Sequence, residues 1–445
     1  MALALSHSAR AGIPIQHWSQ PSGVKVYLVE SHAIAMVDLQ IDFDAGGRRD
    51  PRDKAGLASV TAAMASKGVL AAAGRGAGGA AEPALDENGL SEAWADLGAS
   101  FGASASADRM GFALRSLTYP DLLSKAVQLA ARQLGEPAFP AEIWLRERER
   151  LKAAIKESNT RPATVAGRAF SASVYGEHPY GFEMTEATLG RIEVADMQTM
   201  YASRIRPCRA KVAIVGAVTR AQADQLVAQL FARLGPAGAS AACAAQSEVP
   251  EVKPLTQAED RRIDFDSAQA HVLLGQPGFR RDDPDFFALT VGNYILGGGG
   301  FVSRLSTEVR EKRGLRYSVY SYFSPGLHAG AFTVGLQTRP DQAAQALAVS
   351  REVLARFVRE GPTPLELEAA KSNLVGGFAL RIDSNRKLLE NVASIAWNNL
   401  PLDYLDTWTK QVQAVGLADI RAAFARKLQP DRMVTVVLGA SNPTN

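Results

Sequence analysis

Cysteine and histidine are scarce in this sequence. Cys208 and Cys243 are the only two cysteines, and neither belongs to a C-x-x-C motif or to a metal-ligand spacing. They are interpreted as two unrelated thiols, unless export of the protein allows them to pair. The six histidines are His7, His17, His32, His178, His271 and His328. No two of them are close enough to form a local pair of metal ligands, so no metal ion is expected in this chain.

Long apolar runs and runs of like charge are also missing. The apolar stretches are shorter than the roughly 18 to 20 residues that a membrane-spanning helix needs, so no membrane span is expected. The net charge is +3, and acidic and basic residues are interspersed. Without a basic tract or a basic array with aromatic residues, nucleic acid is not expected as a partner. A hydrophobic fraction of 47% with 21% charged residues indicates a folded globular protein.

The N-terminal residues carry the one indication of location. Residues 2–5 are apolar, and residues 9–11 read Ala-Arg-Ala just before Gly12. A short apolar stretch that ends in A-x-A is typical of the end of a secretory signal. This interpretation predicts a periplasmic protein whose mature chain begins near Gly12. The alternative is an ordinary alanine-rich terminus of a cytoplasmic protein.

An internal repeat lies near the end of each half of the chain. Residues 194–217 read VADMQTMYASRIRPCRAKVAIVGA and residues 417–440 read LADIRAAFARKLQPDRMVTVVLGA, and the two align without a gap. The identical pairs are Ala195/Ala418, Asp196/Asp419, Ala202/Ala425, Pro207/Pro430, Arg209/Arg432, Gly216/Gly439 and Ala217/Ala440. In both copies, a helix with an acidic first turn ends before a proline, and an apolar strand follows.

The repeat predicts two homologous domains, residues 12–235 and residues 259–445. The linker between them, residues 236–258, is rich in glycine, alanine, serine and proline and has no sustained periodicity. Strands and helices occur in blocks in each half, which favours an α+β class in which a mostly antiparallel sheet packs with helices. Period-2 alternation predicts strands at 24–29, 36–43, 110–117, 270–275, 317–323 and 330–337. Helices are predicted at 54–67, 120–134, 141–158, 194–205, 283–295, 302–312, 341–359, 364–379 and 402–413.

Residues 44–69, DAGGRRDPRDKAGLASVTAAMASKGV, resemble the lead-in and zinc helix of the pitrilysin-like metallopeptidases, in the branch of the processing peptidases. Members of that family carry an inverted zinc motif, H-x-x-E-H, on this helix. The chemistry requires two imidazoles one helical turn apart, a third ligand from a distant Glu, and a Glu as general base. Here the motif positions are Ser59, Val60, Thr61, Ala62 and Ala63, so the base and both histidines are absent.

Other residues of the first half do not replace the missing ligands. The distal carboxylate of the family falls in the segment 147–157, where Glu149 or Glu157 is its expected remnant, and one carboxylate cannot hold zinc. Ser59 has no neighbouring His or Lys and no tight turn that would make it a nucleophile. His178 stands in a His-Pro-Tyr-Gly turn that also resembles the family and is expected to be structural.

Residues 294–319, YILGGGGFVSRLSTEVREKRGLRYSV, give the most specific resemblance to the family. The family pattern is a glycine-rich turn, a helix, and an Arg and a Tyr that correspond to Arg310 and Tyr317. An arginine offers a fork of donors to substrate carbonyls, and a neutral tyrosine can donate to a developing oxyanion. The resemblance implies that this pair acts on a zinc site of another chain. Alternatively, Arg310 is a solvated charge and Tyr317 a core aromatic.

The four glycines of this segment have two interpretations. Gly297, Gly298, Gly299 and Gly300 lack the spacing of a phosphate-binding loop. They are interpreted either as a tight turn or, by resemblance to the non-catalytic processing-peptidase subunit, as a substrate contact.

The resemblance covers nearly the whole chain and implies a non-catalytic subunit. It would form one half of a clamshell with a homologous subunit that holds zinc in its H-x-x-E-H motif, and the pair would cleave short peptides held along a sheet edge. This chain would bind no cofactor itself and would be inactive alone. One alternative is a structural or assembly core protein of the same fold without peptidase function. Another is a peptide-binding module that acts alone.

Overall fold

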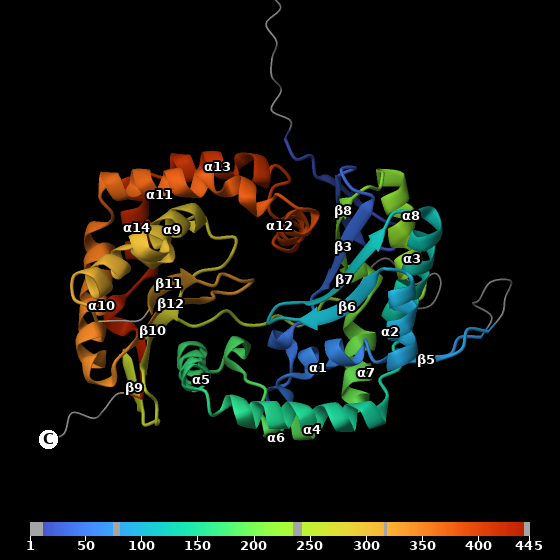
Figure 1. Cartoon of the computed structure of the whole chain (residues 1–445), viewed down its shortest axis with the longest axis horizontal. Helices are drawn as coiled ribbons and strands as arrows, with labels where there is room; N and C mark the ends of the chain where they lie inside the picture. The colour runs from blue at the N-terminus through green and yellow to red at the C-terminus, as the bar shows by residue number, and fades with distance from the viewer. Residues whose placement is uncertain (1–11, 74–80, 235–242, 316–317, 440–445) are drawn as a thin grey trace, which may run out of the picture.

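Two large sheets covered by helices form the protein (Figure 1). The computed structural model describes residues 12–73, 81–234, 243–315 and 318–439, so the predicted signal at residues 1–11 lies outside the described residues. The first sheet, in spatial order, is β1 (Gln16–Ser19), β2 (Lys25–Glu30), β8 (Lys211–Gly216), β3 (Met36–Phe43), β7 (Met110–Leu117) and β6 (Ser100–Ala105). The second is β11 (Ser318–Phe323), β12 (Ala331–Thr338), β10 (Ala270–Pro277), β13 (Val434–Leu438) and β9 (Glu259–Ile263).

The two sheets share one strand order. Strands β2, β8, β3, β7 and β6 correspond to β9, β13, β10, β12 and β11, because in each sheet the first pair is parallel and the following pairs are antiparallel. The repeat in the sequence is the helix and strand at the parallel pair: α7 (Val194–Arg204) before β8, and α14 (Leu417–Lys427) before β13. The α+β class with two similar domains is confirmed.

The repeat extends beyond the segment in which identical residues are visible. In the first domain α3 (Pro120–Gly135), α4 (Ala141–Ser158) and α5 (Pro162–Tyr175) follow one another. In the second domain α10 (Ala343–Glu360), α11 (Pro364–Gly376) and α12 (Asn385–Trp397) begin at the same spacing. The remaining helices are α1 (Leu57–Met64), α2 (Glu87–Asp96), α6 (Glu186–Arg191), α8 (Arg220–Phe231), α9 (Phe286–Asn293) and α13 (Tyr404–Ala414).

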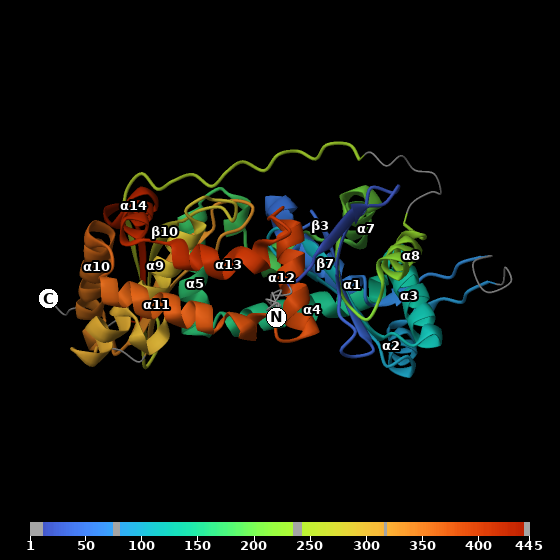
Figure 2. The ribbon, with the colours of Figure 1, turned by 90° about the horizontal axis from the view of Figure 1, so that it is seen from above.

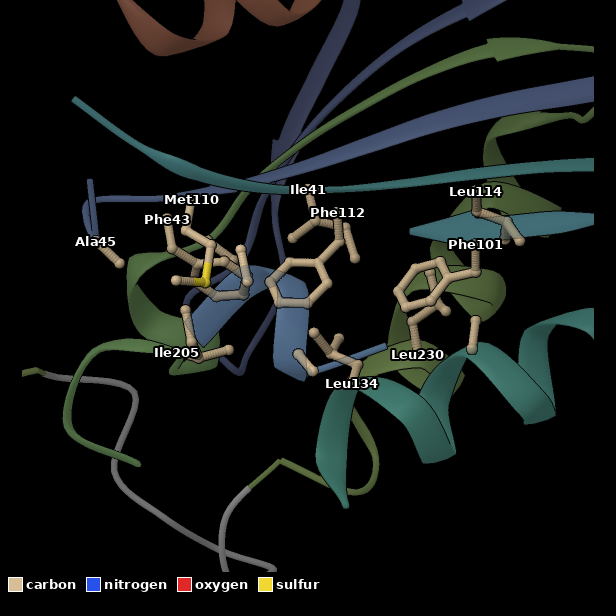
Figure 3. Packing of buried hydrophobic residues seen from close by; sticks show 14 of the residues in the cluster. Ile41, Phe43, Ala45, Phe101, Met110, Phe112, Leu114, Leu134, Ile205 and Leu230 are labelled. Atoms are coloured by element: carbon tan, nitrogen blue, oxygen red, sulfur yellow. The ribbon is translucent and has the colours of Figure 1, made fainter. Parts of the chain in front are cut away.

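The core of the first domain lies between its sheet and helices α1, α3, α7 and α8 (Figure 3). Alternate residues of β3 point into it, among them Ile41 and Phe43. The Phe43 ring meets Phe112 of β7 edge-on at 5.9 Å, and Phe101 of β6 stacks on Phe112 at the same distance. Aromatic contacts of this kind add to the stability gained from burial.

The other face of each sheet is covered by a helix from the opposite domain. Helix α12 of the second domain packs on β8, β2 and β3 of the first sheet, where its Leu389 and Val392 meet Val29 and Val215 in one apolar cluster. Helix α5 of the first domain packs on β10 and β13 of the second sheet in the same way. The two domains therefore exchange one helix each, and they cannot separate without exposing these apolar faces.

A half-buried lysine fixes the end of α12 on the first sheet. The Lys211 ammonium of β8 donates to the carbonyl oxygens of Ala396 (2.8 Å) and Trp397 (3.0 Å) and to Asn399 Oδ1 (2.8 Å). A cation at this position satisfies carbonyl groups that the helix leaves unpaired and complements the negative end of its dipole. Burial lowers the pKa of Lys211 to about 8.

The linker runs along one side of the molecule from the first domain to the second (Figure 2), and a disulfide and two hydrogen bonds attach it to the first domain. Cys208 and Cys243 form a disulfide, with their Cα atoms 5.8 Å apart, so the interpretation of two unrelated thiols is wrong. Arg209 then donates to Ala244 O, and Arg49 donates to Ser247 O, each at 2.9 Å. The two cysteines are far apart in sequence, and only the path of the linker over the first domain brings them together.

A polar cluster joins the domains where the linker ends. Asp108, in the β6–β7 turn, accepts hydrogen bonds from Tyr180 Oη (2.6 Å) and from Leu327 N of the second domain (3.0 Å). Glu251 of the linker accepts from Ala329 N (2.8 Å) and lies 3.4 Å from His328 Nδ1. His178 is 7% exposed and its ring centroid lies 5.0 Å from that of His328. The His-Pro-Tyr-Gly turn thus holds the two domains together.

Most predicted helices and strands are present, with two local differences. The predicted helix 302–312 is instead a 3₁₀ turn, Gly300–Val302, followed by a π-helical segment, Ser306–Glu311. The predicted helix 54–67 is shorter, because Gly56 has a φ of +101° and sets the start of α1 at Leu57. In the described part of the chain, no helix is both long and apolar enough to cross a membrane.

We expect the disulfide to stabilise the attachment of the linker. The double variant Cys208→Ser/Cys243→Ser should lose about 3–4 kcal/mol of unfolding free energy, since the bond closes a loop over a sequence separation of 35. Urea unfolding under oxidising conditions measures the change. A reducing agent should lower the midpoint of the parent protein and leave the variant unaffected. Equal midpoints for parent and variant would contradict this role.

The polar cluster should make the protein less stable in mild acid. Burial, the neighbouring His328 and Arg48 lower the pKa of His178 from its ordinary 6.5. The unfolded chain therefore takes up a proton at a higher pH than the folded one, so stability is lost as the pH falls below about 6.5. The other titratable groups that face His178 in this cluster are the carboxylates of Asp108 and Glu251 and the tyrosine hydroxyl groups.

The thermal midpoint measured between pH 5 and 8 tests this expectation. His178→Asn keeps an acceptor for Tyr180 N and should have a shallower decrease of the midpoint below pH 6.5 than the parent. The exposed His32 lies outside the cluster, and His32→Asn is the matched control for the loss of an imidazole. A parent-like slope in His178→Asn would show that this histidine is not responsible.

Candidate functional site

Helix α1 keeps the shape of a zinc helix without its ligands. Ser59 and Ala63 are exposed and lie one turn apart on the same side of the helix, whereas Ala62 is buried. Asp50 accepts hydrogen bonds from Gly56 N and Ala58 N, both at 3.0 Å, and so satisfies backbone donors at the start of the helix. Burial raises the pKa of Asp50 to about 7. The two predicted ligand positions, Ser59 and Ala63, therefore lie on one exposed side of the helix, and neither side chain can bind a metal.

The carboxylates expected as the distal ligand point elsewhere. Glu149 is exposed and pairs with Lys152 at 2.9 Å, and Glu157 is exposed and pairs with Arg161 at 2.5 Å. Glu147 instead lies on the side of α4 that faces the end of α1. Residues two apart are separated by about 200° around a helix, so Glu147 and Glu149 lie on opposite sides. The structure therefore places Glu149 and Glu157 in surface ion pairs and Glu147 beside Lys67.

A lysine occupies the space between the carboxylates beside α1. Lys67 continues the spacing of Ser59 and Ala63, and its Nζ lies 2.5 Å from Glu87 Oε1 and 3.9 Å from Glu147 Oε1. The hydrogen bond from Lys67 lowers the pKa of Glu87. The ammonium group thus supplies positive charge to these carboxylates. Across the described residues, no group of three or more His, Cys, Asp and Glu side chains could hold a metal ion.

Arg310 projects from the π-helical segment of the second domain into solvent. Its guanidinium lies over the ring of Phe301, with Cζ 4.5 Å from the ring centroid. The acidic neighbour Glu308 pairs instead with Lys312 (2.8 Å) and Arg313 (2.9 Å). Among the described residues, no carboxylate lies within ion-pair distance of Arg310. Its N–H groups therefore remain available. Tyr317, its predicted partner, lies outside the described residues.

The four glycines shape the loop before Arg310. A side chain at Gly297 would come within 2.4 Å of Ser321 Oγ and 2.5 Å of its backbone nitrogen, so Gly297 allows the loop to pack on β11. Gly299 lies close to Tyr294 O, and Gly300 has a φ of +64°. After this turn Phe301 and Val302 are 69% and 75% exposed. A side chain at Gly298 would come within 2.8 Å of Asn293 Nδ2, so close contacts or backbone conformation account for all four glycines.

Each half of the predicted site lies beside the edge of a sheet. Helix α1 packs next to β6, the outermost strand of the first sheet, and the segment of Arg310 packs against β11, the outermost strand of the second. Figure 1 places these edges in the two different domains. Sequence reasoning did not find β6, because its residues, Ser-Phe-Gly-Ala-Ser-Ala, include few strand-forming side chains.

Comparisons with known proteins agree with this architecture. Residues 191–374 match the family model described as the peptidase M16 inactive domain, a match that includes Arg310 and begins after α1. The crystal structure described as the peptidase M16 inactive domain from Pseudomonas fluorescens has a TM-score of 0.87 and 33% identity. It covers 97% of this chain and 99% of that chain. A protease structure from Helicobacter pylori has a TM-score of 0.83 at 18% identity, covering 96% and 99%, which shows a shared fold alone.

Curated relatives carry different names. A Streptomyces coelicolor protein named as an uncharacterized zinc protease is 30% identical over 300 residues, which are 66% of this chain and 64% of that protein. The chain thus spans just under two thirds of the length of that relative. The Helicobacter pylori protein named non-peptidase homolog YmxG is 24% identical over 404 residues, covering 89% of this chain and 87% of that protein.

The identity to the Pseudomonas structure extends over almost the full length of both chains, and the two repeated domains match throughout. At the positions of the zinc motif, the chain has Ser59, Ala62 and Ala63. The chain therefore belongs to the peptidase M16 family, as a non-catalytic member without the zinc-binding histidines.

Proposed function

We propose that this chain is the non-catalytic subunit of a heterodimeric zinc endopeptidase. Its partner would be a homologous chain that holds zinc in an H-x-x-E-H motif, and the two would enclose short peptide substrates. Arg310 carries the proposal, because its guanidinium is exposed, held by Phe301 and unpaired with any carboxylate among the described residues. A guanidinium in this state can donate to a substrate carbonyl at the partner's zinc site.

The edge of β6 supports a role in binding extended peptides. Exposed strand edges in proteins are usually protected by charged residues or proline, but β6 contains neither. No atom lies within 4 Å of a side chain added at Gly102, so the face of the sheet is open at the middle of this strand. A peptide could add there as a further strand through main-chain hydrogen bonds.

The disulfide supports a periplasmic location for this complex. Bonds of this type persist in oxidising compartments and are rare in the cytosol. The bond between Cys208 and Cys243 fastens the linker and would be retained there. A cytoplasmic location is the alternative.

The competing function is that of a structural or assembly core protein. That function predicts a stable large complex in which no subunit carries H-x-x-E-H. Purification from the native host under mild conditions, followed by identification of the co-eluting chains, separates the two. A zinc-bearing homologue in equal amount supports the peptidase proposal, and a complex without one supports the assembly function.

Removal of the Arg310 guanidinium should slow peptide cleavage by the reconstituted heterodimer. Hydrogen bonds that involve a charged group contribute about 1.5–3 kcal/mol, so Arg310→Gln should lower kcat/KM by about ten- to a hundredfold. Arg313→Gln is the matched control, because Arg313 lies in the same segment but already pairs with Glu308. Cleavage should also stop when a chelator removes zinc. Equal effects of the two substitutions would contradict the proposed role of Arg310.

Tyr317→Phe should mainly lower kcat. Loss of one hydrogen-bond donor to an oxyanion typically costs about 100- to 1,000-fold in kcat, whereas the binding of the substrate changes little. Steady-state kinetics of the heterodimer with a fluorogenic peptide give kcat and KM separately. Tyr320→Phe, which removes an exposed hydroxyl from the neighbouring strand β11, serves as the control. A change in KM alone would argue for a binding role of Tyr317 instead.

A further inference from the structure

A cavity of about 500 Å³ lies between the two domains. The β6–β7 turn of the first domain and four segments of the second domain contribute to its wall. The residues that the argument uses are Asp108, Arg109, Arg281, Phe286, Tyr322 and Trp397. Its volume is typical of sites that hold a small molecule or one to two residues of a peptide.

Arg281 contributes an uncompensated positive charge to this cavity. Its Nη2 donates to Tyr404 Oη at 2.7 Å, and its Cζ lies 3.7 Å from the ring centroid of Phe286. Throughout the described ranges of the chain, no carboxylate approaches the Arg281 guanidinium to ion-pair distance. The guanidinium is therefore held in place by aromatic groups and keeps N–H donors for another acceptor.

The acidic residues next to Arg281 are engaged with other cations. Asp282 pairs with Arg280 at 3.0 Å. Asp283 pairs with Lys427, and Asp285 pairs with Arg426 at 2.6 Å. The charge of Arg281 is thus left without a partner although three carboxylates follow it closely in the sequence.

The other charged groups of the wall offer further donors but little negative charge. Arg109 uses Nη1 for Asp42 at 2.7 Å, and its Cζ lies 5.6 Å from the Trp397 ring centroid. Asp108 accepts from Tyr180 Oη through one oxygen and from Leu327 N through the other. Asp108 also pairs with Arg48 Nε at 3.3 Å, so the charges of Asp108 and Arg109 are both matched and that of Arg281 alone is left. One singly charged acid fits the balance of charges.

We propose that this cavity binds the C-terminal carboxylate of a short peptide whose last residue has an aromatic or large apolar side chain. Arg281 would hold the carboxylate with two parallel N–H donors. Phe286, Tyr322 and Trp397 would contact the terminal side chain. The choice of a peptide rests on the proposed function, whereas the choice of a carboxylate rests on Arg281. Because the aromatic contacts already fix the guanidinium, little side-chain freedom is lost on binding.

A pair of peptides tests the proposal on the purified chain without a partner. Both carry a fluorophore at the N-terminus and end in phenylalanine, one as the free acid and the other as the amide. Fluorescence anisotropy should show binding of the acid at least tenfold tighter than that of the amide. Equal affinities would overturn the proposal, and this comparison requires no altered protein.

Substitutions assign the preference to Arg281. Arg281→Gln should remove the difference between acid and amide, and Arg281→Lys should retain part of it because the charge remains. Arg280→Gln is the control, since Arg280 is adjacent and pairs with Asp282. A full preference for the acid in Arg281→Gln would overturn the assignment. Circular dichroism and the thermal midpoint show whether each variant is folded.

Two further outcomes separate this inference from the proposed function. If inorganic phosphate or acetate displaces the acid peptide at a concentration similar to that of the peptide itself, the site recognises anions in general and the peptide assignment is wrong. If the acid preference is present but no zinc-bearing partner is found, the cavity assignment stands and the proposed function fails. If the heterodimer cleaves peptides but acid and amide bind equally, the proposed function stands and the cavity assignment fails.

Discussion

The exchange of α5 and α12 is the interaction on which the rest of the structure depends. Each sheet has one face on its own helices and the other on a helix from the opposite domain. Burial of each large apolar side chain contributes about 1.5–3 kcal/mol, as an upper estimate, and α12 alone buries Leu388, Leu389, Val392 and Ile395. The relative position of the sheets is therefore set by packing. The edges of β6 and β11 and the cavity at Arg281 all depend on that position.

The zinc helix persists without zinc because its stability comes from packing. Val60, Thr61 and Ala62 are buried, and Asp50 binds the backbone at the start of α1, so the helix does not need a metal to form. The carboxylates beside it still require a positive charge, which Lys67 supplies to Glu87 and Glu147. An ammonium group thus balances the charge of these carboxylates in place of a metal ion. Packing and these ion pairs therefore hold the helix in place without metal ligands.

The sequence predicted the features that depend on local pattern. The helix α4 was predicted with its observed bounds, and the repeat at 194–217 and 417–440 predicted two domains with the same helix and strand at the parallel pair. The sequence also shows that Ser59 and Ala63 stand where the motif would have histidines, because a ligand motif is recognised by residue types at a fixed spacing. These features need no knowledge of how distant segments meet.

The features that the sequence did not reveal depend on contacts between segments that are far apart in the chain. Helix α12 was not among the predicted helices, and its place on the first sheet follows only from the packing of the two domains. The pairing of Cys208 with Cys243 depends on the path of the linker over the first domain.

Arg281 and Arg310 show what the charge pattern of a sequence leaves undetermined. Both stand in segments crowded with charged residues, in which Asp282, Asp283 and Glu308 pair with other cations. Each guanidinium instead rests on an aromatic ring, Phe286 for Arg281 and Phe301 for Arg310. A ring restricts the position of the group without occupying its N–H donors, whereas a carboxylate would occupy them. An arginine held in this way keeps N–H donors available for a ligand. For that reason both arginines are proposed to bind a ligand, although their surroundings differ.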